Sequence, residues 1–461
     1  MSQLFIKNGT VVFEEYVQKC DILIKNGKIA GFYTPGDGPD DVEILDASGL
    51  HIMPGSIDPH MHLGIYRDFA RDMKYDTQRA AIGGVTTLVN FHRSNEDYFK
   101  TIPEAIKTAS ENSIVDFAFT IGIIKKKHID ELEDYVRKLK ITSFKFYFDK
   151  QDELESFYGL EKGSALTSDK ADMYFILQRM KEIDDRLLLC LHCEDTELFV
   201  PIGEKVKQSD ADQYTLKTFG STRPDFAETS SVMSAMWVNS VVEGNIYIVH
   251  LSSGSSARMI KALKKETNGR VSVETCPHYL ALDDEAPCNL NGKVVPPIHK
   301  KSDGEALWRG IIEGTINSMG TDNCPIDLAK KYEKGTDVRQ TRPGFPGAGM
   351  ILPVLISEGY HKRGISLSRL SQINSINTAR RFLLADKGEM KVGCDADFAM
   401  IDLEWEREID KNLFGDCDFS IYEGMKFKGW PRYTMVRGTL VQKDGKVTAQ
   451  PGHGIFIERN L

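Results

Sequence analysis

The sequence lacks any long uninterrupted hydrophobic run. Its longest candidate, residues 114–124, contains Asp116 and falls short of the roughly 18 apolar residues that a membrane-spanning helix needs. Residues 1–9 combine a short apolar run with an Asn-Gly pair, which is typical of a strand and a turn rather than of a secretion signal. We therefore expect no association with a membrane.

Concentrated basic charge is also missing. The 58 Lys and Arg residues are outnumbered by 67 Asp and Glu residues, the net charge is −9 at pH 7, and the longest basic run is Lys125-Lys126-Lys127. Proteins that bind nucleic acid usually gather positive charge to match the phosphate backbone. We therefore expect no nucleic-acid partner.

Cysteine is sparse for a chain of this length. Eight residues dispersed over 461 positions form no dense disulfide framework of the kind found in small secreted domains, so the sequence favours the reducing cytoplasm. Cys190 and Cys193 have C-x-x-C spacing, but no second such pair completes a zinc knuckle. We interpret them as small buried residues on a strand.

What is present is an ordinary globular composition, with 41% hydrophobic and 27% charged residues, and two kinds of local pattern. Both chain ends show short alternating runs typical of strands, at residues 4–6, 11–13, 21–25, 28–32, 396–403 and 434–442. The pairs Asn8-Gly9 and Asn26-Gly27 predict hairpin turns, and Asp444-Gly445 repeats the pattern.

The long middle of the chain alternates apolar runs with helical periodicity. Eight runs are found, at residues 55–63, 85–91, 115–123, 141–148, 186–192, 245–251, 270–276 and 315–321, and residues 305–317 form one of the helices expected between them. Eight buried parallel strands with intervening helices predict an α/β fold, a (β/α)8 barrel. We assign residues 53–385 to the barrel, and residues 1–52 and 386–461 to a discontinuous β-sandwich domain.

Polar residues typical of metal sites lie at the ends of several of these runs, where barrel enzymes carry their chemistry. They are His60 and His62 in the first run, Lys145 in the fourth, His192 in the fifth, His250 in the sixth and Asp322 after the eighth. Two histidines at positions i and i+2 of a strand point to the same face, so both can reach one metal ion.

Each of these residues has an ordinary structural interpretation when taken alone. A histidine at a strand end can be a hydrogen-bonded core residue, a buried lysine can extend to the barrel rim, and Asp322 can cap a turn or helix. Their joint placement favours a metal site. His51, His128, His361 and His453 fall outside this pattern, and we interpret them as structural.

A lysine ammonium repels cations, so Lys145 fits a metal site only after a change in its chemistry. A desolvated lysine is neutral more readily than an exposed one, and the neutral amine can capture CO2. The resulting carbamate is an anionic ligand on a stem long enough to bridge two metal ions.

The whole constellation resembles the amidohydrolase superfamily and, within it, the cyclic amidohydrolases typified by hydantoinase and dihydropyrimidinase. The resemblance covers nearly the whole chain, and no single motif carries it. The matching segments are 53–62 (MPGSIDPHMH), 83–87 (GGVTT), 143–145 (SFK), 250–253 (HLSS), 274–280 (ETCPHYL), 295–297 (VPP), 305–308 (EALW), 393–397 (GCDAD) and 423–430 (EGMKFKGW).

The resemblance implies two Zn²⁺ ions per chain, one held by His60, His62, Lys145 and Asp322 and the other by N6-carboxylated Lys145, His192 and His250. It also implies that a hydroxide between the ions attacks the carbonyl of a cyclic ureide or imide, with Asp322 as the general base. The backbone of Val295 would contact the substrate, and the chain would form a homotetramer or dimer.

The segments that surround the substrate depart from their relatives. Gly64 stands where dihydroorotases carry an arginine, residues 65–67 replace the Glu-Pro-Gly of allantoinases, Lys150 replaces a hydantoinase tyrosine, and Asn323 replaces a histidine. The implied metal ligands are therefore intact while the substrate contacts are altered. Our first hypothesis is an enzyme that acts on a hydantoin-like or dihydropyrimidine-like substrate. The alternative is an enzyme that acts on an allantoin-like substrate or another lactam. A non-catalytic hydantoinase-like scaffold is the third hypothesis.

Overall fold

The computed structural model describes residues 3–39, 41–148, 151–267, 270–413 and 415–461. Its largest sheet has eight parallel strands in sequence order, and each coincides with one of the eight predicted apolar runs, with β9 extending one residue beyond its run. They are β8 (Ser56–Met61), β9 (Val85–His92), β10 (Asp116–Gly122), β11 (Ser143–Tyr147), β12 (Leu188–His192), β13 (Asn245–Ile248), β14 (Val271–Thr275) and β15 (Ser318–Met319). The backbone N–H of His62 donates to the carbonyl of Asn323 at 2.8 Å, so the sheet closes into a barrel, and the predicted (β/α)8 fold is confirmed.

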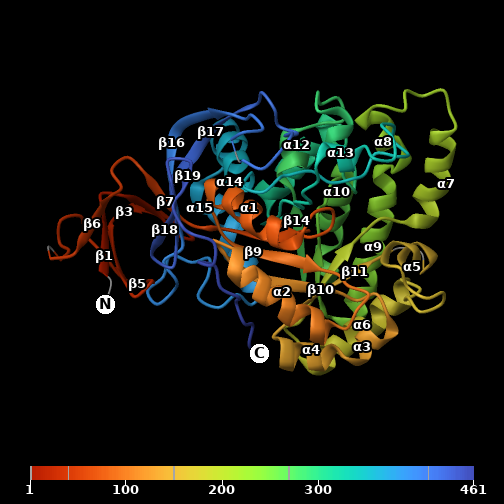
Figure 1. Ribbon diagram of the computed structural model, residues 1–461, viewed down its shortest axis with the longest axis horizontal. Helices are drawn as coiled ribbons and strands as arrows, with labels where there is room; N and C mark the ends of the chain where they lie inside the picture. The colour runs from red at the N-terminus through yellow and green to blue at the C-terminus, as the bar shows by residue number, and fades with distance from the viewer. Residues whose placement is uncertain (1–2, 40, 149–150, 268–269, 414) are drawn as a thin grey trace.

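Helices connect these strands and cover the barrel (Figure 1). They are α1 (Phe69–Ile82), α2 (Tyr98–Asn112), α3 (Lys126–Asp130), α4 (Leu132–Leu139), α5 (Gln151–Tyr158), α6 (Lys170–Ile183), α7 (Thr196–Lys207), α8 (Leu216–Thr222), α9 (Asp225–Val242), α10 (Gly254–Leu263), α11 (Pro277–Ala281), α12 (Lys301–Glu313) and α13 (Leu328–Lys331). Short helical segments follow, namely α14 (Ile351–Val354), η3 (Leu355–His361), α15 (Leu367–Ser371), η4 (Gln372–Ile376) and α16 (Asn377–Arg381), and η1 (Lys264–Thr267) and η2 (Asn289–Gly292) lie earlier in the chain.

Helix α12 differs in its bounds from the helix predicted over residues 305–317. It ends at Glu313 because Gly314 adopts a left-handed conformation with φ of 81°, which glycine allows without steric cost. Leu307, Trp308 and Ile311 form its buried face as predicted, whereas Ile312 is 54% exposed.

Two further sheets lie beside the barrel, and both chain ends build them (Figure 1). The order β5-β4-β1-β6 defines one, with β1 (Gln3–Lys7), β4 (Asp21–Lys25), β5 (Lys28–Tyr33) and β6 (Glu43–Asp46). The order β19-β18-β17-β16-β7-β2-β3 defines the other, with β2 (Thr10–Val12), β3 (Val17–Lys19), β7 (His51–Pro54), β16 (Phe398–Glu408), β17 (Lys426–Val436), β18 (Thr439–Lys443) and β19 (Lys446–Val447). Ile22, Phe398 and Met400 belong to one hydrophobic cluster, so the two ends share a core.

The predicted hairpins have different outcomes. Asn26-Gly27 joins the antiparallel strands β4 and β5, and Asp444-Gly445 joins β18 and β19, as their left-handed turn conformations require. The hairpin predicted at Asn8-Gly9 is wrong, because β1 and β2 lie in different sheets. There the left-handed Asn8 redirects the chain from one sheet to the other. The run predicted at residues 434–442 is divided by a turn at Arg437-Gly438.

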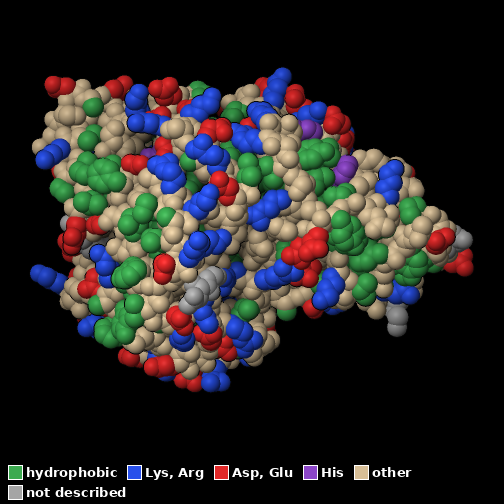
Figure 2. Space-filling model, turned by 180° about the vertical axis from the view of Figure 1, so that it is seen from behind, with side chains coloured by type: hydrophobic (Ala, Val, Ile, Leu, Met, Phe, Trp, Pro, Cys, Tyr) green, Lys and Arg blue, Asp and Glu red, His purple; other side chains and the backbone are tan. Residues whose placement is uncertain are grey.

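Among the described residues no helix is both long and apolar enough to cross a membrane. Figure 2 shows one face of the molecule, on which basic and acidic side chains are interspersed and hydrophobic side chains gather only in small groups. No broad basic surface covers this face.

Candidate metal centre

Three of the predicted ligands, His60, His62 and Asp322, meet at the C-terminal end of the barrel. His60 lies on β8, His62 follows that strand, and Asp322 follows β15. The Nε2 atoms of the two histidines are 3.2 Å apart. Oδ1 of Asp322 lies 3.1 Å from Nε2 of His62 and 3.5 Å from Nε2 of His60, so three donor atoms face one point.

The turn that presents Asp322 is fixed by close packing and by a buried carboxylate. A Cβ atom on Gly320 would lie 2.7 Å from Oε2 of Glu274 and 2.9 Å from Cβ of His60, so only glycine allows this approach. Asp58, on β8, accepts hydrogen bonds from the backbone N–H of Thr321 at 3.0 Å and from its hydroxyl at 2.5 Å. Asp322 then adopts a left-handed φ of 50°, a conformation that aspartate tolerates better than most residues.

The other two predicted histidines form a second pair. His192 is the last residue of β12, and His250 follows β13. Nδ1 of His192 lies 2.9 Å from Nε2 of His250. The rings of His250 and His60 stack with centroids 5.4 Å apart, which places the two groups of donors side by side.

Lys145 lies on β11 and lines the cavity that opens over these two groups of donors. Its side chain is buried, and among the described residues its Nζ atom has no hydrogen-bond partner, so it does not extend to solvent. Nζ lies 5.2 Å from the ring centroid of Phe91 and 5.0 Å from that of Tyr147. Burial lowers the pKa of Lys145 to about 8, which makes the neutral, CO2-reactive amine accessible near neutral pH.

The four histidines are held in the form that binds metal ions. Burial lowers the pKa of His60, His62 and His250 well below the ordinary value. Burial also lowers the pKa of His192, although the nearby Glu194 opposes the shift. A neutral imidazole offers a nitrogen lone pair, and this is the protonation state that metal coordination needs.

The donor set fits a divalent metal ion. Ligands at about 2.0–2.1 Å in a tetrahedron are separated by about 3.3 Å, and the three separations among His60, His62 and Asp322 are 3.1, 3.2 and 3.5 Å. These three residues also form a group whose ligand atoms all lie within 4.8 Å of one another. The orphaned Nζ of Lys145 marks a polar group that no described residue satisfies by a hydrogen bond.

Two carboxylates that the sequence analysis did not assign orient the histidines. Oε1 of Glu274, on β14, lies 2.8 Å from Nδ1 of His60 and accepts the backbone N–H of His250 at 2.9 Å. Oε2 of Glu194 lies 2.9 Å from Nε2 of His192 and accepts a hydrogen bond from Arg223 at 2.5 Å. Partners of this kind fix the tautomer and the ring orientation of metal-binding histidines. A glutamate inside the apolar run 270–276 was the available signal for Glu274.

A cavity of 310 Å³ opens over these residues. His62, Lys145, His192, His250 and Asp322 all line it, while His60 lies behind them. Further lining comes from Ile65, Tyr66, Arg93, Tyr147, Phe148, Glu194, Thr196, Phe199, Arg223, Val294, Val295, Cys324, Pro343 and Gly344. Val295, the predicted substrate contact, lies at the cavity, whereas Lys150 lies outside the described residues.

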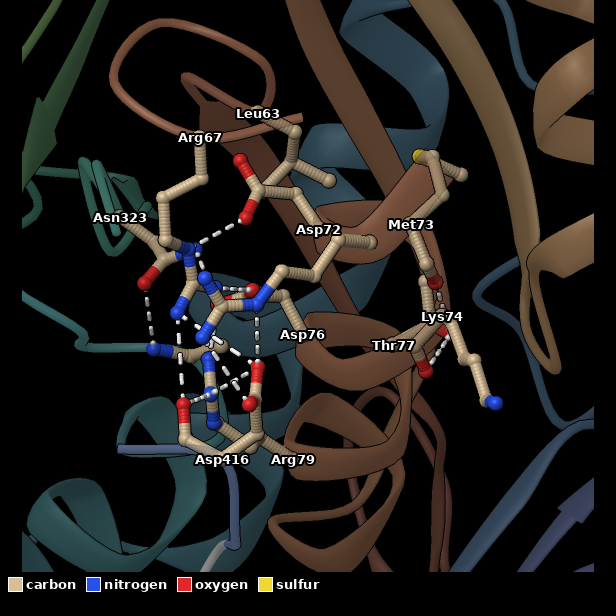
Figure 3. Close-up of polar contacts among 12 residues, drawn as sticks. Leu63, Arg67, Asp72, Met73, Lys74, Asp76, Thr77, Arg79, Asn323 and Asp416 are labelled. Atoms are coloured by element: carbon tan, nitrogen blue, oxygen red, sulfur yellow. Dashed lines mark hydrogen bonds and ion pairs between the residues drawn. The ribbon is translucent and has the colours of Figure 1, made fainter. Parts of the chain in front are cut away.

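A buried ionic network supports one wall of this cavity, and Figure 3 shows its members converging from α1 and from the segment after β15. Arg67 pairs with Asp72 at 2.7 Å and with Asp76 at 2.8 Å. Asn323 donates from Nδ2 to Asp76 at 3.0 Å, and its Oδ1 accepts the backbone N–H groups of residues 347 and 348 at 2.7 and 3.1 Å. Arg67 and Asn323, two of the departures from the relatives, thus join the loops on either side of the metal centre.

A second group of carboxylates has a structural explanation. Asp116, Asp395 and Asp397 lie close enough together to suggest a cation site. The ammonium of Lys387 occupies their centre, at 2.5, 2.8 and 2.7 Å from the three carboxylates. These charges are therefore neutralised by the protein's own cation.

A (β/α)8 barrel with four neutral histidines, a buried lysine and an aspartate at its C-terminal end defines a metal-dependent hydrolase of the amidohydrolase type. Residues 51–441 match the model of the amidohydrolase family. The chain is 30% identical to a D-hydantoinase of Geobacillus stearothermophilus, over 98% of this chain and 96% of the relative, and 28% identical to an allantoinase of Rubrobacter xylanophilus, over 98% and 97%. The solved dihydropyrimidinase of Brevibacillus agri superposes with a TM-score of 0.90 at 26% identity, over 99% of both chains. The chain belongs to the amidohydrolase family, within its cyclic amidohydrolases, and it is an enzyme.

Proposed function

We propose that this enzyme opens the ring of a cyclic ureide or imide, a hydantoin-like or dihydropyrimidine-like compound, by hydrolysing one amide bond. The observation that carries the proposal is the convergence of three histidines, Lys145 and Asp322 at one cavity large enough for a small ring, with His60 behind them. The relatives named hydantoinase and dihydropyrimidinase support the same substrate class.

The metal ligands follow from the two groups of donors. His60, His62 and Asp322 would hold one Zn²⁺, and His192 and His250 would hold the other. Lys145 would bridge the two ions after its neutral amine adds to CO2 with loss of one proton, which gives an N6-carboxylated side chain. Once bound, the two ions would polarise the ring carbonyl and lower the pKa of a water molecule.

Asp322 is the residue that moves the proton in this proposal. Its carboxylate lies at the cavity and adjoins both His60 and His62. As the general base it accepts a proton from the attacking water, and it returns that proton to the amide nitrogen that leaves. The products are a carboxylate and, on the same open chain, a ureido group from a ureide or a carboxamide from an imide.

The residues that differ from those of the relatives bear mainly on the identity of the substrate. Val295 offers a backbone group at the cavity, as the resemblance implies for substrate binding, whereas lysine in place of the hydantoinase tyrosine removes a phenol that could accept and donate hydrogen bonds. We therefore propose weak or absent activity on unsubstituted hydantoin and dihydrouracil, with better activity on substituted cyclic ureides or imides. An allantoin-like compound or another lactam is the second candidate, supported by the allantoinase relative.

A panel of cyclic amides tests the proposal directly. The zinc-loaded protein is assayed on hydantoin, substituted hydantoins, dihydrouracil, allantoin and simple lactams, with the Asp322→Asn variant as the blank. We expect turnover on at least one substituted ureide or imide. Efficient hydrolysis of dihydrouracil, at about 10⁵ M⁻¹s⁻¹ or above, would contradict the proposed preference, and hydrolysis of lactams alone would replace the substrate class.

Metal content separates the enzyme from the non-catalytic scaffold. We expect close to two Zn²⁺ ions per chain by elemental analysis after purification under zinc-replete conditions, and the loss of at least one in His192→Ala. His361→Ala is the matched control, because Nε2 of His361 bonds the carbonyl of Leu403 away from the cavity. An empty wild-type site would favour the scaffold.

We also propose that the chain forms a homo-oligomer, a tetramer or a dimer, in the cytoplasm. Helix α9 exposes Phe226, Met233, Trp237 and Val241 along one stripe, an apolar face of the kind that subunit interfaces bury. All eight cysteines are free thiols, as a reducing compartment requires. Trp237→Glu should lower the mass measured by light scattering, and unchanged mass would place the interface elsewhere.

The division at residues 53 and 385 into barrel and end domain stays a prediction.

A further inference from the structure

A second cavity, of 490 Å³, opens at the opposite end of the barrel from the metal centre. Its wall includes Asn245, Ser272 and Ser318, which lie at or next to the first residues of β13, β14 and β15. Asn377 and Arg381 of helix α16 cover it. It shares no lining residue with the catalytic cavity. We name it the N-terminal cavity because it opens at the N-terminal ends of the barrel strands.

The charge of the N-terminal cavity is strongly one-sided. Four arginines, Arg186, Arg270, Arg380 and Arg381, line it together with a single carboxylate, that of Asp185. Such a concentration of guanidinium groups attracts anions, because opposite charges interact strongly where protein walls exclude water.

Three of these arginines are already neutralised by carboxylates. Arg270 makes two contacts of 2.8 Å with Asp185. Arg186 lies 2.8 Å from Asp184, and Arg380 lies 2.7 Å from Glu14. These ion pairs account for the charge of the cavity rim.

Arg381 differs from its neighbours because its partners are neutral. Its Nε donates to the hydroxyl of Ser272 at 2.7 Å, and its Nη1 donates to Oδ1 of Asn245 at 2.7 Å. Among the described residues Nη2 has no hydrogen-bond partner and no carboxylate pairs with this guanidinium. Burial and the charge of Arg270 lower the pKa of Arg381. A partly buried charge without a counter-ion is costly, and an anion in the cavity would relieve that cost.

We propose that the N-terminal cavity is a binding site for a small oxyanion, a phosphate or a carboxylate, with Arg381 as its main ligand. The planar guanidinium recognises two oxygens of such a group at once. The hydroxyl of Ser272 and the amide of Asn377 line the same cavity and offer further hydrogen bonds. This site is independent of the proposed hydrolytic function.

The test is calorimetric titration of the metal-loaded, full-length protein with inorganic phosphate and, separately, with malonate, in a buffer free of other oxyanions. We expect one saturable site beyond any binding at the metals. Arg381→Gln should weaken this binding by about tenfold or more, because a charge-assisted contact is lost. Tighter binding of phosphate or of malonate identifies the oxyanion, and either result supports the site.

A second variant keeps the proposal testable if Arg381→Gln does not fold. Asn377→Asp leaves Arg381 in place and sets a carboxylate one helical turn before it on α16, so the internal anion should compete with the external one and weaken binding to a similar extent. Arg137→Gln is the matched control, since Arg137 is an exposed arginine paired with Glu133 on a distant helix. No saturable binding to the wild type, or binding that both cavity variants leave unchanged, would overturn the proposal.

Discussion

Nδ1 of His60 lies 2.8 Å from Oε1 of Glu274, although 214 positions separate the two residues in the chain. The same carboxylate oxygen accepts the backbone N–H of His250, and the other oxygen accepts the hydroxyl of Tyr247 at 2.9 Å. One buried glutamate on β14 therefore fixes a histidine from each of the two donor groups. The relative placement of the two groups depends on this strand as much as on the strands that carry the ligands.

Glu274→Gln should weaken metal binding while the barrel stays folded. The amide keeps the shape of the side chain but replaces one of the two oxygens that hold His60, His250 and Tyr247 with an NH2 donor, and loss of such a partner typically costs about 10–100-fold in metal affinity. Competition with a chelator of known affinity measures the change. Glu313→Gln, on the exposed face of α12 and paired with Lys261, is the control, and equal affinities in the two variants would show that Glu274 has no such role.

Lys145→Ala should abolish turnover, and short carboxylic acids such as acetate or propionate should restore part of it. The substitution removes the proposed bridging carboxylate, and a free carboxylate can occupy the space that it leaves. Initial rates with and without the acid give the answer. Lys138→Ala, an exposed lysine paired with Asp134, should behave as the wild type. Density for an unmodified Lys145 in the metal-loaded, active enzyme would contradict carboxylation.

Asp322→Asn should lower kcat by at least about 10²–10⁴-fold, the range for loss of a general acid–base group. Asparagine is nearly isosteric but cannot take up the proton. Because Asp322 also adjoins His60 and His62, part of its metal should be lost as well, and elemental analysis separates the two effects. Turnover close to that of the wild type would place the general base elsewhere.

Lys331 predicts a dependence of stability on pH that is independent of catalysis. Its buried ammonium donates to the carbonyls of Arg342 at 3.0 Å and of Gly344 at 2.7 Å, and burial, with help from the charge of Lys293, lowers its pKa to about 7. The ordinary value is near 10.4, so between these pH values the unfolded chain binds more protons, and this residue's contribution to stability rises with pH.

The measurement compares the free energy of unfolding of the wild type and of Lys331→Met at pH 7 and pH 9. The difference, wild type minus variant, should increase with pH, by at most about 1.4 kcal/mol per pH unit. Lys330→Met is the control, because that neighbouring lysine is partly exposed and paired with Glu333. Parallel pH profiles for wild type and Lys331→Met would show that the buried lysine keeps its ordinary pKa.

Local pattern was enough to predict the barrel and the convergence of these polar residues at its C-terminal end. Buried parallel strands are apolar throughout, so a histidine or lysine at a strand end is conspicuous, and the barrel topology brings such ends together. His60, His192 and His250 could therefore be placed at one end of the barrel from the sequence, although they are far apart along the chain.

The supporting contacts could not be predicted in the same way. Glu274, Glu194 and Lys387 act through partners that only the folded barrel brings near, and a buried charge in the sequence does not reveal its partner. Asn8-Gly9 shows the corresponding limit for local structure. An Asn-Gly pair specifies a left-handed turn, but the pairing of the flanking strands is decided by the cores that they enter.

The shared sheet of the two chain ends has a consequence for biosynthesis. Strand β7 pairs with β16 through His51 and Ile401, and about 350 residues lie between them. At a synthesis rate of 5–20 residues per second, β7 waits roughly 20–70 s for its partner. During that time its edge is open to pairing with other nascent chains. The end domain therefore cannot form until the barrel has been synthesised, and β7 keeps one unpaired edge throughout that time.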